Sequence, residues 1–248
     1  MAHRGHRAAL WLLSGAALAA FLVIIECAVF ELMGDARYRT LESTASYSGT
    51  ESGGMPHTEE DPLAQALAVN SEVVGWLHVE NPRISYPVVQ AGPDKPADFY
   101  LSHDLWGARN PAGCPFLDTR ANPAGTHLII YAHRMGVPGA MFNDLARADT
   151  SSVFSSLGQL VWTGADGTSG TYQPVCSLRV DKRYAPIQAF SWQDQNELRA
   201  WLEDLLDDSI QRAPSWQALC IRAHKVITLV TCTDAAYPDD RTLVVFAA

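Results

Sequence analysis

Cys232 is the residue in this chain whose type and setting most clearly suggest chemistry. It lies in ITLVTCTDAAYPDDR, residues 227–241, where an apolar and β-branched run gives way to turn-forming residues. A cysteine thiol with a pKa near 8.5 is only about 3% thiolate at pH 7, so it needs a partner to act as a nucleophile. The usual partner is a histidine that comes from elsewhere in the fold.

His133 is the best candidate for that partner among the eight histidines. It follows the apolar run HLIIYA and precedes the turn RMGVPG, so it occupies the same kind of position as Cys232. Arg241 opens the next apolar run, and it lies close to Cys232 if that run returns antiparallel to the cysteine strand. A guanidinium beside a developing oxyanion would complete an acyl-transfer site. Spacing alone leaves a plainer interpretation open, with Cys232 as core filler, His133 as a solvated turn residue and Arg241 as a strand-end charge.

Short strands separated by proline and glycine dominate the region that carries these residues. Eight apolar segments read as strands: VGWLHV, ISYPVVQ, CPFLD, THLIIYAH, GQLVWTG, TYQPVCSLRV, VITLVTC and RTLVVFAA. Many short strands with turns at this spacing favour a closed or nearly closed β-barrel over a βαβ sheet. The sequence therefore predicts a mainly β fold of about eight strands.

Two helices are expected beside the strands. A short amphipathic helix is predicted from Pro62 onward, in PLAQALAVNSEVV. The second lies in NELRAWLEDLLDDSIQR, just before the cysteine strand, where apolar residues recur at i, i+3, i+4, i+7 and i+8. These residues are Leu198, Trp201, Leu202, Leu205 and Leu206.

The N-terminal quarter has a different composition from the rest. The sequence predicts a cytoplasmic N-terminus over 1–7, a transmembrane signal anchor over 8–33, a flexible extracytoplasmic linker over 34–61 and a catalytic domain over 62–248. Arg4 and Arg7 precede the uncharged run from Ala8 to Ile25, and they predict that the remainder of the chain is exported. A cleaved signal peptide is the alternative, but no clear small-x-small cleavage site follows the apolar run.

Composition excludes several other functions. The formal net charge is −9 and the 18 Lys and Arg residues are scattered, so no basic stripe suits nucleic acid. Neither GxGxxG nor GxxxxGKS occurs, and the five cysteines are too irregularly spaced for a CxxC metal site. No metal or cofactor is expected, and pairing among Cys114, Cys176 and Cys220 stays open.

The motif around the cysteine resembles that of the sortases of Gram-positive bacteria. The string TLVTC, residues 228–232, matches the sortase TLxTC pattern at every fixed position. Arg241 stands in place of the family arginine, and His133 in YAHR corresponds to the histidine of the usual YGH string. NSEVVGWLHV, ISYPVVQ, FYLSHD, GCPFLD and MFNDL further resemble class B sortases over about 63–248.

The resemblance implies a closed sortase-type barrel with an N-terminal helix and a long helix over Asn196 to Ile210. It also implies a membrane-anchored cysteine transpeptidase that needs no cofactor. Cys232 would cleave a C-terminal sorting signal of an exported protein through a thioester, and an amine of the peptidoglycan precursor or of a pilin would resolve it. His133 would be the general acid and base, and Arg241 would stabilise the oxyanion. The sorting signal, the acceptor amine and the choice between wall anchoring and pilus polymerisation stay open.

Further residues follow from the resemblance by position. Leu101 in FYLSHD corresponds to a residue that lines the signal-binding groove, with a core position as the alternative. Asp234 corresponds to an acidic residue near the cysteine, with a plain turn residue as the alternative. Val230 and Thr231 of the motif are also candidates for substrate binding. Val230 replaces a common serine and Ala132 a common glycine, so the expected signal preference is left open.

Two rival functions compete with the transpeptidase. Exported cysteine peptidases and L,D-transpeptidases also use cysteine and histidine, but the histidine follows the cysteine in papain-like folds, whereas His133 precedes Cys232. The non-enzymatic alternative is a catalytically inactive, membrane-tethered β-barrel that binds wall peptides or surface proteins.

Overall fold

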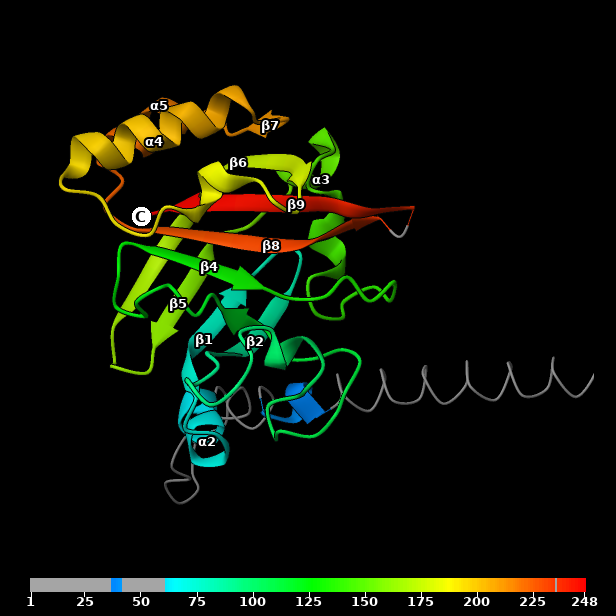
Figure 1. The fold of residues 1–248 in the computed structure, drawn as a ribbon. Coiled ribbons are helices and arrows are strands. Elements are labelled where there is room, and N and C mark those ends of the chain that lie inside the picture. The colour runs from blue at the N-terminus through cyan, green and yellow to red at the C-terminus, as the bar shows by residue number, and fades with distance from the viewer. Residues whose placement is uncertain (1–36, 42–60, 235) are drawn as a thin grey trace, which may run out of the picture.

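Eight strands close into a β-barrel in the computed structural model, which describes residues 37–41, 61–234 and 236–248. Around the barrel the order is β5-β1-β2-β3-β4-β8-β9-β6, and a β5–β6 pairing closes the ring. The strands are β1 (Val73–Val79), β2 (Ile84–Val89), β3 (Phe116–Leu117), β4 (His127–Tyr131), β5 (Leu160–Gly164), β6 (Ser169–Asp181), β8 (Val226–Asp234) and β9 (Tyr237–Ala247). The expectation of a mainly β, closed eight-stranded barrel is confirmed (Figure 1).

A ninth strand was not predicted. β7 (Gln211–Arg212) pairs with the outer edge of β6 through Cys176↔Arg212 and Ser177↔Gln211. These two residues come directly after the helix expected over Asn196 to Ile210, and two polar residues carry no strand pattern of their own. Their pairing is a consequence of tertiary contact.

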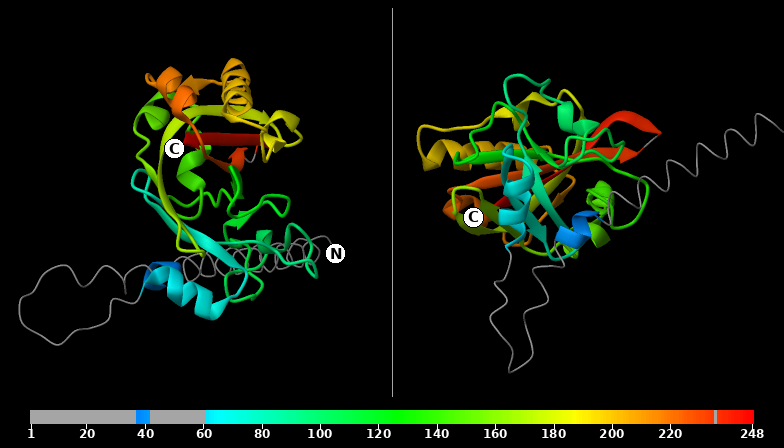
Figure 2. Two further views of the ribbon diagram at one scale, coloured as in Figure 1. Left: turned by 90° about the vertical axis from the view of Figure 1, so that its left-hand side faces the viewer. Right: turned by 90° about the horizontal axis from the view of Figure 1, so that it is seen from below.

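Helices cover two opposite regions of the barrel (Figures 1 and 2). Near one end α2 (Pro62–Val69) packs against β1, and at the other side α4 (Gln195–Asp207) and α5 (Trp216–Arg222) lie together over the sheet. The remaining elements are α3 (Ser151–Ser155) and three short 3₁₀ turns, η1 (Phe99–Leu101), η2 (Asn143–Arg147) and η3 (Ala185–Gln188).

The predicted late helix is α4, and it is shorter than expected. Asp194 caps it by accepting hydrogen bonds from the amides of Asn196 and Glu197, at 2.8 and 3.0 Å. The helix ends at Asp207 instead of Ile210, and α5 intervenes before the cysteine strand. The four leucines of its apolar face are buried: Leu198, Leu202, Leu205 and Leu206.

β8 is central and apolar on both faces, as its sequence suggests. Ile227 and Leu229 face the cluster that fills the barrel. Val226 and Val230 belong to a second cluster, which also contains the leucines of α4. Because both faces are covered, the strand is held rigidly up to the residues that follow it.

The β8–β9 hairpin extends further than the sequence suggests. The segment from Thr233 to Asp240 reads as a turn, but β8 continues to Asp234 and β9 begins at Tyr237. Cys232 therefore lies two residues before the end of its strand. The register between β8 and β9 shifts between Cys232 and Asp234, an irregularity that can redirect a side chain near a site.

Part of the segment predicted as a linker packs against the barrel. Residues 37–41 are helical, and Tyr38 is only 1% exposed. Its hydroxyl donates to the Gly113 carbonyl and accepts from the Leu105 amide, at 3.2 and 3.0 Å.

The predicted membrane anchor over 8–33 lies outside the described residues, as do the cytoplasmic N-terminus over 1–7 and linker residues 42–60. Among the residues that are described, no helix is both long and apolar enough to cross a bilayer.

Candidate active site

Cys232 and Arg241 are direct cross-strand partners. The antiparallel register of β8 and β9 pairs them Cα to Cα. Arg241 Nη1 donates to the carbonyls of Pro238 and Asp240, each at 2.9 Å. The hairpin's own backbone thus holds the Arg241 guanidinium, and Cys232 and Arg241 are both partly exposed.

His133 lies beside Cys232, because β4 runs parallel to β8 and the two strands are in register. β4 pairs with β8 through Tyr131↔Val230, and the bond from the Ala132 amide to the Val230 carbonyl continues the pairing at 3.2 Å. His133 is two residues beyond Tyr131, just as Cys232 is two residues beyond Val230. The chain therefore brings the histidine just beyond β4 next to the cysteine of β8 and the arginine of β9.

The His133 ring is oriented by a backbone carbonyl. Its Nε2 lies 2.7 Å from the carbonyl oxygen of Leu101, at the end of η1. A carbonyl oxygen can only accept, so Nε2 carries the proton of this hydrogen bond. Nδ1 is then the nitrogen that is left for proton exchange.

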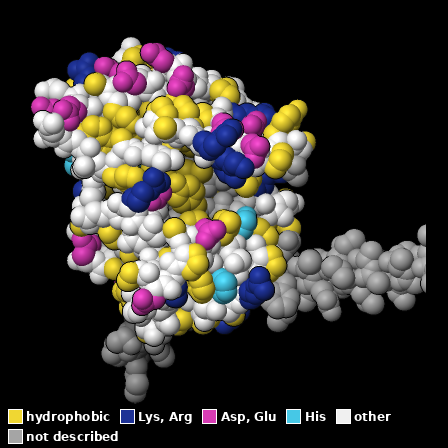
Figure 3. Space-filling view, in the orientation of Figure 1, with side chains coloured by type: hydrophobic (Ala, Val, Ile, Leu, Met, Phe, Trp, Pro, Cys, Tyr) yellow, Lys and Arg dark blue, Asp and Glu magenta, His cyan; other side chains and the backbone are white. Residues whose placement is uncertain are grey.

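All three residues line one groove of about 740 Å³. Figure 3 shows a hollow near the middle of one face, where hydrophobic side chains lie between His and Lys or Arg side chains. The groove lining also includes Leu101, Val230 and Thr231, so three of the four further candidates lie there. Leu101 is 41% exposed, which excludes the alternative of a core position.

Asp234 is placed differently. It is exposed in the hairpin, where its carboxylate accepts from the Ala236 amide at 2.9 Å, and it is not among the residues that line the groove. Thr231 has another distinction, because its hydroxyl oxygen is buried without a hydrogen-bond partner in the described part of the chain.

A buried carboxylate forms one wall of the groove, and sequence reasoning missed it. Asp118 accepts from Arg120 Nε and Nη2 at 2.9 and 2.7 Å, and from the Tyr131 hydroxyl at 3.0 Å. Burial raises the pKa of Asp118, but the hydrogen bonds and charge of Arg120 outweigh it and the pKa is lowered. Burial and the Asp118 charge raise the pKa of Tyr131. The DTR string, residues 118–120, gives only a weak signal for such a pair.

The other described cysteines are poor nucleophiles. Cys114, Cys176 and Cys220 are buried and free, so the pairing left open by the sequence is not present. Burial raises the thiol pKa of Cys114 and of Cys176 to about 12. Cys232 is the partly exposed thiol among the described cysteines, which agrees with its assignment as the candidate nucleophile.

A second histidine, His127, contacts β8, the strand that carries the TLVTC string, from the protein interior. His127 is fully buried, with Nδ1 2.6 Å from the Ala189 carbonyl and Nε2 2.8 Å from the Thr228 hydroxyl. Burial lowers its pKa from 6.5 to about 4, so the ring is neutral near pH 7. It fixes Thr228 of the TLVTC string and does not reach the groove.

The known proteins that this chain resembles in sequence and in fold are class B sortases. No family model matches the chain. Sortase B of Listeria monocytogenes is 35% identical over 89 residues, which is 35% of this chain and 35% of that protein. The match thus spans about a third of the length of the curated relative.

Similarity of fold extends much further. The Clostridium perfringens sortase B structure aligns with a TM-score of 0.64 and 20% identity, covering 74% of this chain and 97% of the other. A Bacillus anthracis protein described as similar to sortase B aligns at 0.68 and 21%, covering 87% and 95%. A Staphylococcus aureus sortase B–substrate complex aligns at 0.67 and 19%, covering 86% and 94%. These findings confirm the resemblance to class B sortases and show a shared fold.

Proposed function

We propose that this chain, which resembles the class B sortases in sequence and shares their fold, acts as a cysteine transpeptidase on exported proteins. The observation that carries the proposal is the direct pairing of Cys232 with Arg241 in a groove that His133 also lines. A nucleophile, a proton carrier and a fixed cation beside one cavity are what acyl transfer requires.

In the first half-reaction the Cys232 thiolate attacks a peptide carbonyl of the sorting signal. The carbonyl electron pair moves to oxygen, and Arg241 stabilises the resulting oxyanion from its position on β9. When the tetrahedral intermediate collapses, the C–N bond breaks and His133 gives its proton to the leaving amine. The product is a thioester between Cys232 and the N-terminal fragment.

The second half-reaction reverses these roles. An acceptor amine loses a proton to His133 and attacks the thioester carbonyl, and Arg241 again stabilises the oxyanion. The C–S bond breaks and Cys232 leaves as thiolate, so the net change is the exchange of one amide for another. Cysteine, histidine and arginine return to their starting states, and the sequence suggests no cofactor.

The substrate class follows from the same resemblance. We propose that the substrates are exported proteins with a C-terminal sorting signal, and that the acceptor is an amine of the peptidoglycan precursor or of a pilin. One of the similar structures is a Staphylococcus aureus sortase B–substrate complex, and this supports a substrate for the same fold here. We also propose that residues 8–33 anchor the chain in the cell membrane with the domain outside; this part rests on the uncharged run over 8–25 and on Arg4 and Arg7 before it.

The test is a cleavage and ligation assay with the full-length chain. A panel of internally quenched peptides with candidate sorting signals is incubated with and without an amine acceptor. We expect cleavage, and a ligated product when the amine is present, and we expect Cys232→Ala to abolish both. Cys176→Ala is the matched control, because it removes a buried thiol away from the groove and should keep wild-type turnover.

Two further variants test the roles of the neighbouring residues. His133→Ala and Arg241→Ala should each lower kcat by roughly 100-fold or more, the size found for removing a general acid–base and for removing one oxyanion donor, respectively. Binding of a signal peptide that survives in Cys232→Ala, together with no turnover in the wild type, would instead support the inactive binding barrel.

A further inference from the structure

The hydrogen bond between His133 and Leu101 depends on the path of the segment that carries Leu101. Leu101 ends η1, which lies in the long connection between β2 and β3. Its carbonyl can face His133 only while this connection keeps its path, because η1 is a single 3₁₀ turn with little rigidity of its own.

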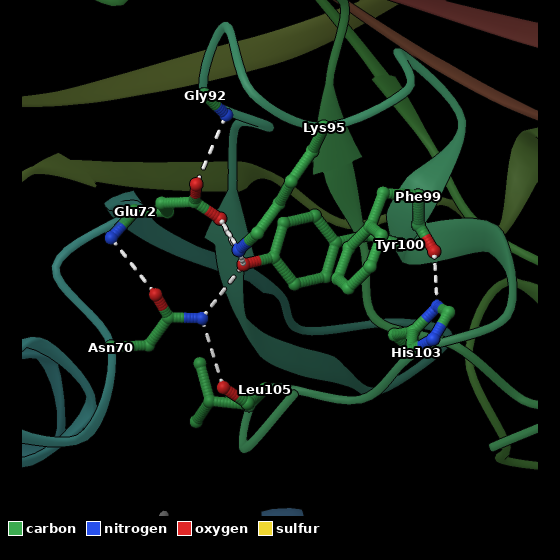
Figure 4. Close-up of polar contacts among 8 residues, drawn as sticks. All are labelled: Asn70, Glu72, Gly92, Lys95, Phe99, Tyr100, His103 and Leu105. Atoms are coloured by element: carbon green, nitrogen blue, oxygen red, sulfur yellow. Dashed lines mark hydrogen bonds and ion pairs between the residues drawn. The ribbon is translucent and has the colours of Figure 1, made fainter. Parts of the chain in front are cut away.

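A partly buried polar cluster on the far side of η1 holds that path (Figure 4). Its centre is the Glu72 carboxylate, which accepts from Lys95 Nζ at 2.6 Å, from the Gly92 amide at 3.0 Å and from the Tyr100 hydroxyl. Burial raises the pKa of Glu72, but the hydrogen bonds from Lys95, Tyr100 and Gly92 outweigh it and the pKa is lowered. The carboxylate is therefore charged near neutral pH, and it ties three points of the connection to the start of β1.

Asn70 completes the cluster from the end of α2. Its side-chain amide donates to the Tyr100 hydroxyl and to the Leu105 carbonyl, both at 2.9 Å. The amide therefore clamps the connection on both sides of Leu101. Tyr100 itself is only 1% exposed, so its ring has little freedom to move once the hydroxyl is held.

Contacts within the β2–β3 connection complete the positioning of η1. The Tyr100 carbonyl accepts from the Cys114 amide at 3.0 Å, while the ring of Phe99 stacks on His103 at 3.9 Å. Tyr100, which precedes Leu101, is thus anchored through its carbonyl, and the stacked rings of Phe99 and His103 lie two residues to either side of Leu101. Its carbonyl is left to His133.

We propose that Glu72 and Tyr100 are positioning residues for the transfer reaction. By anchoring η1 they hold the Leu101 carbonyl against His133 Nε2, so that Nδ1 is the nitrogen that exchanges protons with the substrate. The assignment of Nδ1 to proton exchange rests on the transpeptidase function proposed above, whereas the hydrogen bond and the tautomer do not.

The test reads the His133 tautomer directly, without substrate. The full-length chain is labelled with ¹⁵N in its histidine rings, and the His133 signals are assigned by their loss in His133→Ala. In the neutral ring of the wild type, measured at alkaline pH, we expect the Nε2–H tautomer. In Tyr100→Phe and Glu72→Gln we expect a mixture of the two tautomers.

Matched controls separate positioning from general damage. Tyr184→Phe removes a tyrosine hydroxyl that bonds Asp208 elsewhere on the surface, and Glu203→Gln removes a carboxylate paired with Arg199 on α4. Both should keep the wild-type tautomer. If Tyr100→Phe or Glu72→Gln does not fold, Lys95→Gln removes only the cation from the cluster, at a side chain that is 34% exposed.

Kinetics give the second readout. With a cleaved peptide, Tyr100→Phe should lower kcat about tenfold, while KM changes less than twofold. An Nδ1–H tautomer in the wild type, or an unchanged tautomer in all folded cluster variants, would overturn the proposal. Failure to find any cleaved peptide would count against the proposed function alone, because the tautomer is measured on the resting protein.

Discussion

At the scale of single residues, exposure separates the reactive groups from the structural ones. His127 and His133 lie at the start of and just after one strand, yet His127 is fully buried while His133 is partly exposed. Likewise Cys114 and Cys176 are buried with raised pKa values, and Cys232 is partly exposed. Residue type alone makes all five of these side chains candidates for catalysis. Burial and position on the barrel decide which of them can contact a substrate.

His127 should make the fold sensitive to mild acid. Its pKa is about 4 in the folded chain against an ordinary 6.5, so unfolding takes up a proton between these values and stability falls as pH falls through that window. At about 1.4 kcal/mol per pH unit, roughly 2 kcal/mol of unfolding free energy should be lost between pH 7 and 5 from this residue.

Urea unfolding of the full chain at pH 7 and 5 measures this loss. His127→Gln should be less stable at pH 7 but should show a pH dependence smaller than the wild type by about that amount. His224→Gln, at an exposed position, controls for the loss of one histidine. An equal pH dependence in wild type and His127→Gln would contradict the prediction.

At the scale of elements, close backbone approach joins the β2–β3 connection to the groove. Gly113 has φ +63°, and a Cβ on it would lie 2.3 Å from the Tyr100 carbonyl oxygen and 3.0 Å from that of Leu101. Only glycine fits at position 113, against the backbone carbonyls of η1. The glycine thus helps to set where η1 ends, together with the Glu72 cluster.

Gly113→Ala should therefore displace η1 and harm both stability and turnover. We expect a loss of about 2–4 kcal/mol in unfolding free energy, from the positive φ together with the steric contact, and a clear fall in kcat. Gly107→Ala is the matched control, because Gly107 has φ +75° but nothing within 4 Å of its added Cβ. Equal effects of both substitutions on kcat would show that close approach at Gly113 is not what positions η1.

At the scale of the whole molecule, the barrel has an N-terminal attachment that composition does not reveal. Tyr38 packs edge-on against Tyr86 at 5.5 Å between ring centroids, and Arg37 lies 3.7 Å above the Trp106 ring centroid. Arg37 also pairs with the buried Asp104 at 3.5 Å. The helical residues 37–41 thus act as part of the folded domain.

A chain that begins at residue 61 should be less stable than one that begins at 35. Removing a buried aromatic side chain typically costs about 3–5 kcal/mol, which corresponds to a Tm lower by roughly 10 °C for a domain of this size. Calorimetry on the two chains measures the difference, and Tyr38→Ala in the longer chain should reproduce most of it. Coincident melting curves would show that residues 37–41 add nothing to the fold.

The sequence by itself determined the strand pattern, the amphipathic face of α4 and the motif around Cys232. These are local properties, because alternation, 3.6-residue periodicity and a fixed string are written into consecutive residues. Even the approach of Arg241 to Cys232 follows from two strands joined by one turn. The eight strands and their closure were expected from the number and spacing of such segments and from the sortase resemblance.

Only the tertiary structure decided the contacts between residues far apart in the chain. The Leu101 carbonyl on His133, the Asp118–Arg120–Tyr131 wall and the Glu72 cluster join segments whose individual patterns look like ordinary loops and strand ends. β7 and the docking of Tyr38 are of the same kind. Such contacts depend on how strands register around a closed barrel and on which surfaces remain to be covered, and neither is encoded in any single stretch of sequence.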